Sequence, residues 1–101
     1  MYGFWKDVKR LEMVKERFDS IKSGLSVFLT NDESYKKPSR ATSNNREFCM
    51  CEGINSKSKH WQRESKITVG YKGFDLSREY RITWNEANFG GYQFHYCIVE
   101  I

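Results

Sequence analysis

The spacing of apolar residues changes along this chain from a helical period to an alternating one. Through residues 3–23 apolar side chains recur every three or four positions, whereas later segments alternate apolar and polar residues. Helical spacing places one stripe on an α-helix, and alternation places one apolar face on a β-strand. The stripe consists of Phe4, Val8, Leu11, Val14, Phe18, Ile21 and Leu25. We therefore expect an amphipathic helix over residues 3–23, ended by a left-handed Gly24.

The alternating segments predict four or five antiparallel strands after the helix. These strands cover about residues 25–30, 47–53, 66–72, 78–86 and 91–100, with polar loops over 31–46 and 55–65. The face expected to cover the helix stripe consists of Phe48, Met50, Ile67, Val69, Tyr71, Tyr80, Ile82, Trp84, Phe94, Tyr96 and Ile98. The last strand is apolar on both sides, as a central strand would be. The expected fold class is α+β: a single domain over residues 1–101, with the helix packed on a curved antiparallel sheet.

Two pairs of residues that could bind a metal ion, Cys49 with Cys51 and His95 with Cys97, include all three cysteines of the chain. The members of each pair are two positions apart, so they would share a face of a β-strand. By the same alternation they fall on the sheet face away from the helix. Three interpretations remain open for that face: a Zn²⁺ site, a curled sheet that buries the thiols in a small second core, and a partner interface or redox-active thiol. We favour the buried thiols, because a CxC pair on a flat strand suits zinc less well than a CxxC turn. The candidate metal ligands are Cys49, Cys51, His95 and Cys97.

Positive charge gathers in the middle of the chain, which has a net charge of +4. Residues 35–66 carry eight Lys and Arg against three Asp and Glu, whereas residues 67–101 carry three against four. Cations interleaved with aromatic rings are typical of proteins that bind single-stranded nucleic acid, because the cations meet phosphates and the rings stack on bases. The candidate binding residues are Tyr35, Lys36, Lys37, Arg40, Arg46, Lys57, Lys59, His60, Trp61 and Arg63.

The sequence contains no catalytic signature: GxSxG, Walker A, HExxH and GxGxxG are all absent. We therefore expect a non-enzymatic module that binds nucleic acid or a nucleic-acid-bound protein complex. One alternative is a small inhibitor or immunity factor of viral or mobile-element type, which blocks a protein target; another is a zinc-stabilised adaptor. The odd cysteine count and the lack of a secretory or membrane-spanning apolar segment favour a cytoplasmic location without a membrane partner.

Overall fold

The computed structural model of the protein describes residues 2–37, 43–66 and 68–101. In these residues the chain forms one α-helix, two short 3-10 helices and seven strands, and every strand pairing is antiparallel. The α+β class with an N-terminal helix is therefore confirmed. The elements are α1 (Tyr2–Arg17), β1 (Leu25–Thr30), η1 (Glu33–Lys36), η2 (Arg46–Phe48), β2 (Gly53–Asn55), β3 (Ser58–Lys59), β4 (Phe74–Asp75), β5 (Tyr80–Ile82), β6 (Asn85–Phe89) and β7 (Tyr92–Glu100).

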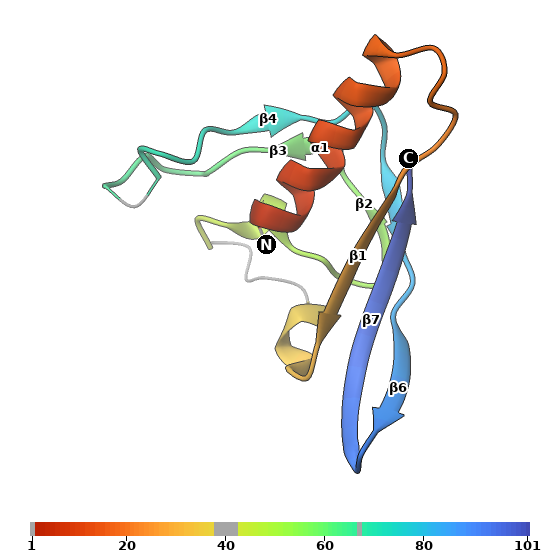
Figure 1. Ribbon diagram of the computed structural model, residues 1–101. Helices are drawn as coiled ribbons and strands as arrows, with labels where there is room; N and C mark the ends of the chain where they lie inside the picture. Colours follow the sequence, from red (N-terminus) through yellow and green to blue (C-terminus); the bar gives the residue numbers. More distant parts are fainter. Residues whose placement is uncertain (1, 38–42, 67) are drawn as a thin grey trace.

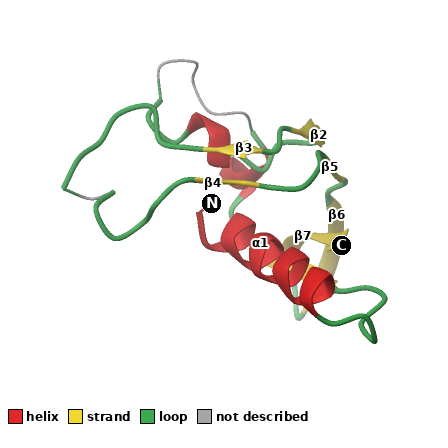
Figure 2. Ribbon diagram, turned by 90° about the horizontal axis from the view of Figure 1, so that it is seen from above, coloured by secondary structure: helices red, strands yellow, loops and turns green. Residues whose placement is uncertain are grey.

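The main sheet has three strands in the order β1–β7–β6, and the remaining strands form two ladders, β2–β5 and β3–β4. The central place of β7 agrees with its two-sided apolar sequence. Of the described strands, those outside the main sheet are two or three residues long, so they do not extend it to the expected four or five strands. In Figures 1 and 2, α1 lies between the main sheet and the β3–β4 ladder.

Two segments expected to be strands have other structures. Residues 46–48 form η2 and irregular backbone follows, although Phe48 and Met50 are buried at 0% and 1% exposure. The described part of segment 66–72 consists of turns and irregular backbone, because its amides bond locally. There the Thr68 amide donates to the Ser65 carbonyl at 3.1 Å, and the Tyr71 amide donates to the Thr68 carbonyl at 3.0 Å. Ile67, which was assigned to the apolar face, lies outside the described residues.

The helix ends at Arg17 rather than at residue 23, and it buries only the first part of the expected stripe, together with Trp5 and Glu12. Its buried residues are Phe4, Trp5, Val8 and Glu12, whereas Val14 and Phe18 of the stripe are 40% and 51% exposed. The residues that follow, Asp19 and Ser20, have low helix propensity and form a turn. Gly24 does not adopt the expected left-handed conformation. Its small size matters instead, because a Cβ there would lie 3.3 Å from Leu11 Cδ2.

A buried carboxyl group joins α1 to the second half of the chain. Glu12 is 8% exposed and accepts hydrogen bonds from the Ser77 amide at 2.9 Å, from Ser77 Oγ at 2.6 Å and from the Tyr80 hydroxyl. Burial, together with this bond to Glu12, raises the pKa of Tyr80 to about 12. A buried acceptor with three donors fixes the position of α1 against β5.

We predict that Glu12→Ala lowers the free energy of unfolding by about 2 kcal/mol, because it leaves the buried Tyr80 hydroxyl, and the two donors of Ser77, without their acceptor. Urea unfolding followed by circular dichroism measures the change. The matched control is Glu16→Ala, one turn further along α1 and exposed, which should change stability by less than about 0.5 kcal/mol. Equal effects of the two substitutions would contradict the role assigned to Glu12.

Candidate functional site

The face of the main sheet that is turned away from α1 is apolar. Residues directly paired across antiparallel strands share a face, and the register pairs Val27 with Ile98 and Leu29 with Tyr96. We call this surface the outer face. It consists of Leu25, Val27, Leu29, Ala87, Phe89, Tyr92, Phe94, Tyr96 and Ile98, with Asn85 and Glu100 as its polar members.

Six of these apolar side chains are at least half exposed. The exposed fractions are 61% for Leu25, 61% for Val27, 57% for Leu29, 62% for Phe89, 70% for Tyr92 and 50% for Ile98. A single exposed apolar residue is ordinary on a protein surface, whereas a contiguous group of this kind marks an interaction surface. The alternation of the strands contained the signal, but the sequence analysis assigned Phe94, Tyr96 and Ile98 to the helix side.

The opposite, inner face of the same sheet carries polar residues, and the chain covers them with its own η1. Asp32 caps η1 by accepting a hydrogen bond from the Ser34 amide at 2.9 Å. This turn brings Lys36 Nζ to 3.2 Å from His95 Nδ1 and Glu33 Oε1 to 3.7 Å from His95 Nε2. His95 is consequently 2% exposed. The inner face therefore combines this covered His95 with the core residues Phe28, Cys97 and Val99, while apolar side chains also occupy the outer face.

This arrangement corrects the expected face of His95 and Cys97, which lie on the helix side of the sheet. Cys97 lies in the hydrophobic core at 0% exposure, and burial raises the pKa of its thiol to about 11. The side chains that alternate toward the inside from β7 onward, and are buried, are those of His95, Cys97, Val99 and Ile101. The rings of Phe4 and Phe28 occupy the inner side, 6.1 Å apart between centroids, so a small side chain fits there better than Tyr96.

The four candidate metal ligands do not come together. In the described residues no group of three or more His, Cys, Asp or Glu is placed to hold a metal ion. Cys49 Sγ donates to the Lys37 carbonyl at 3.4 Å, and Cys51 Sγ lies 3.7 Å from Asn55 Oδ1. Burial and the neighbouring Cys49 raise the pKa of Cys51. Cys97 is thus a small side chain of the main core, while Cys49 and Cys51 are partly buried after η2, so the three thiols do not share the small second core that was expected.

The two aromatic rings expected to stack on bases pack within the protein. The Tyr35 ring lies edge-on to Phe28, with centroids 5.2 Å apart. The Trp61 ring lies 4.5 Å from Phe48 and is stacked on Tyr2 at 6.1 Å. Both rings are half-buried, so each has part of its surface already occupied.

The expected cations have different environments. Lys36 contacts His95, and Lys59 is buried at 1% exposure. Arg40 lies outside the described residues. The remaining candidates are exposed: Lys37, Arg46, Lys57, His60 and Arg63. The structure therefore does not bring the whole expected set to one surface.

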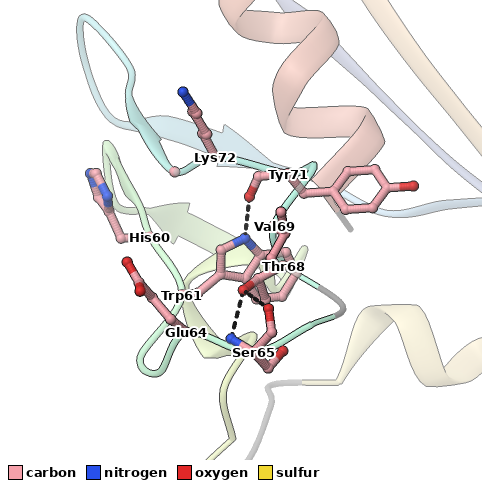
Figure 3. Close-up of a pocket in the computed structure, with 9 residues that line it drawn as sticks. His60, Trp61, Glu64, Ser65, Thr68, Val69, Tyr71 and Lys72 are labelled. Atoms are coloured by element: carbon pink, nitrogen blue, oxygen red, sulfur yellow. Dashed lines mark hydrogen bonds between the residues drawn. The ribbon is translucent and has the colours of Figure 1, made fainter.

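A hollow of about 490 Å³ lies beside His60 and Trp61 and is lined by residues of the loop that joins β3 to β4 (Figure 3). Its polar groups bond to one another: Trp61 Nε1 donates to the Tyr71 carbonyl at 2.6 Å, and the Ser65 amide donates to Thr68 Oγ1 at 2.9 Å. His60 Nε2 lies 3.1 Å from Asp75 Oδ1. These bonds give the residues of the wall a structural role, and they supply no catalytic arrangement among the residues described.

Lys59 occupies an unusual position for a cation. Its Nζ lies 4.3 Å above the centroid of the Trp5 ring and donates to the Ser56 carbonyl at 2.5 Å. Burial lowers the pKa of Lys59 to about 8, although the nearby Glu47 partly opposes the shift. A cation–π contact and one carbonyl replace the water that the ammonium loses on folding.

We predict that stability rises with pH as Lys59 loses its proton. In the folded protein this happens near pH 8, while the unfolded chain keeps the proton until about pH 10.5; between these values the unfolded state binds more protons, so rising pH favours folding. The wild type should gain about 1 kcal/mol relative to Lys59→Met between pH 7.5 and 9. Urea unfolding of both proteins at each pH gives this difference. The raised pKa of Cys97 lowers stability as pH rises, but it does so equally in both proteins and therefore drops out of the comparison. A constant difference between them would contradict the assignment.

In the described part of the chain, no helix combines the length and apolar character needed to cross a membrane. Comparisons of this chain with protein-family models, with curated proteins and with solved structures find no match.

Proposed function

We propose that this chain is a non-enzymatic protein-binding module and that the outer face of β1–β7–β6 is its interface. The observation that carries the proposal is the exposed apolar character of this face. Apolar side chains occupy every position of the outer face except Asn85 and Glu100, and six of them are at least half exposed. The cores of protein interfaces have this aromatic and aliphatic character.

The charge of the sheet favours a protein partner over nucleic acid. The sequences of β1, β6 and β7 contain no Lys or Arg, and their acidic residues are Glu86 and Glu100. A phosphate backbone is bound mainly by cations, which the outer face lacks. Apolar contacts between proteins need no such charge. Among the functions considered from sequence, the geometry therefore supports best the module that binds a protein surface.

The two edges of the main sheet support the same conclusion. In the described structure β1 and β6 each pair on one side, with β7. Monomeric proteins protect such edges with Lys, Pro or a bulge, and β1 contains neither Lys nor Pro over its six residues. An apolar face bordered by unprotected edges is suited to being covered by another protein.

We predict that Val27→Lys together with Ile98→Lys abolishes capture of the partner, since two charges would be buried at the centre of the interface. The double variant and the wild type are tagged and incubated with nuclease-treated lysate of the native host, and captured proteins are quantified by mass spectrometry. The wild type should retain its specific protein about 100-fold better than the variant. The matched control, Val69→Lys, changes a valine that is 76% exposed in another part of the molecule, and it should behave as wild type.

The competing nucleic-acid function has a separate measurement. Binding of the wild type to single-stranded DNA and RNA is titrated at several salt concentrations, alongside the double variant Lys57→Glu with Arg63→Glu. We expect the charge reversal to leave protein capture intact. A steep loss of the captured protein in this variant, with capture by Val27→Lys and Ile98→Lys unchanged, would overturn the proposal in favour of nucleic-acid binding through the loops.

A further inference from the structure

We infer that the occupant of the outer face is a second copy of this chain, packed face to face so that two three-stranded sheets form a sandwich. This inference rests on the proposed function, because it uses the same surface and names its partner. A sheet face of aliphatic and aromatic residues packs best against a surface of the same kind. In the described structure of this chain, the outer face is such a surface.

The arrangement of the face suits a two-fold dimer. In a two-fold interface the same residues contact each other from both sides, so the surface must be complementary to itself. A face with strong charge of one sign would repel its own copy. Here the central pairs are Val27 with Ile98 and Leu29 with Tyr96, all without charge. Glu100 is paired with Leu25 at one end of the strands, at the margin of the face.

The net charge of the chain does not oppose this association. All 17 Lys and Arg residues lie outside β1, β6 and β7. Many of them belong to α1, which covers the inner face of the sheet, and to the loops beyond it (Figure 2). Two copies that meet through their outer faces therefore keep their basic surfaces far apart. Long-range repulsion between molecules of the same sign is then weakest in this orientation.

The exposed area agrees with what a stable dimer needs. Six side chains exposed by half or more present on the order of 600 Å² of apolar surface, taking about 150–200 Å² for each when fully exposed. Two copies would bury about 1,200 Å² from these residues alone, at the lower limit of standard protein interfaces. The half-buried Phe94 and Tyr96 add to this area. A single apolar patch of this size is at the upper limit for monomeric proteins.

Sedimentation equilibrium of the purified chain tests the inference over about 1 to 100 µM. One chain has a mass of 12.0 kDa, and we expect the measured mass to be twice that value. The dissociation constant of the dimer should be about 1 µM or tighter. Val27→Lys with Ile98→Lys should raise this constant by about 100-fold. Val69→Lys should remain dimeric. Circular dichroism spectra that overlay for all three proteins exclude a loss of fold as the cause.

A charge-complementation experiment identifies the face on both copies. Val27→Glu with Ile98→Glu should also be monomeric, whereas an equimolar mixture with the Lys variant should form a mixed dimer, since opposite charges then meet in the interface. The mixed species is resolved by native mass spectrometry. Failure of the mixture to associate, while the wild type is a dimer, would overturn the face-to-face arrangement, because the substituted positions of the two copies would then not meet.

The outcomes separate this inference from the function on which it rests. A wild type that stays at the mass of one chain up to about 100 µM overturns the dimer. If that monomer still captures a host protein that Val27→Lys with Ile98→Lys does not, the protein-binding function stands and its partner is a different protein. If the face variants change neither mass nor capture, both proposals fail.

Discussion

The buried indole of Trp5 is the interaction on which the rest of the fold depends. Phe48, at the end of η2, and the irregular backbone at Cys49 and Met50 lie against the core, and buried carbonyl groups need donors when no neighbouring strand supplies them. Trp5 Nε1 lies 3.1 Å from the Phe48 carbonyl and 3.3 Å from that of Cys49. Trp84 Nε1 donates to the Met50 carbonyl at 2.8 Å. Two indoles therefore supply hydrogen bonds that a sheet would otherwise provide, and they hold α1 and the segment before β6 on the same core.

In the basic loops, a network of hydrogen bonds occupies polar groups that could otherwise meet a ligand. Glu47 accepts hydrogen bonds from Ser58 Oγ at 2.6 Å, the His60 amide at 3.0 Å and Gln62 Nε2 at 2.8 Å. Glu47 thus holds β3 and the residues that follow it to η2. In the same way η1 covers the inner face of the sheet. The outer face has no such covering element in the described structure and remains exposed.

Much of the fold could be predicted from the sequence, but not which face of the main sheet packs against α1. The helical period located α1, and the alternation of Tyr80 and Ile82 around the exposed Arg81 was confirmed in β5. For β7 the hydrophobic pattern fits either face, since Phe94, Tyr96 and Ile98 compete with Cys97, Val99 and Ile101. Long-range features decide between them: the register of β1, the rings of Phe4 and Phe28, and the return of η1. None of these is visible in local spacing, so the candidate interface was assigned to the wrong side.

Burial without regular structure also escaped prediction. Phe48 and Met50 were correctly expected to be buried, but the strand that was to place them does not form. Their carbonyl groups depend on indoles far away in the sequence, so the segment has no local conformational signal. The end of α1 is similar, because the apolar stripe continues to Ile21 while the helix itself stops at Arg17.

The pairing of β1 with β7 has a consequence for how the chain reaches its native state. Leu25 pairs with Glu100 and Thr30 with His95, so each contact closes a loop that contains most of the chain. Closing so long a loop is slow and costs conformational entropy before any contact compensates it. Until then β1 is an uncharged segment of high β-propensity with both edges open. The rate of its pairing with β7 of the same chain is proportional to the protein concentration, whereas the rate of its pairing with another molecule is proportional to the square of that concentration. Concentration during refolding therefore decides whether β1 enters its own sheet or an aggregate.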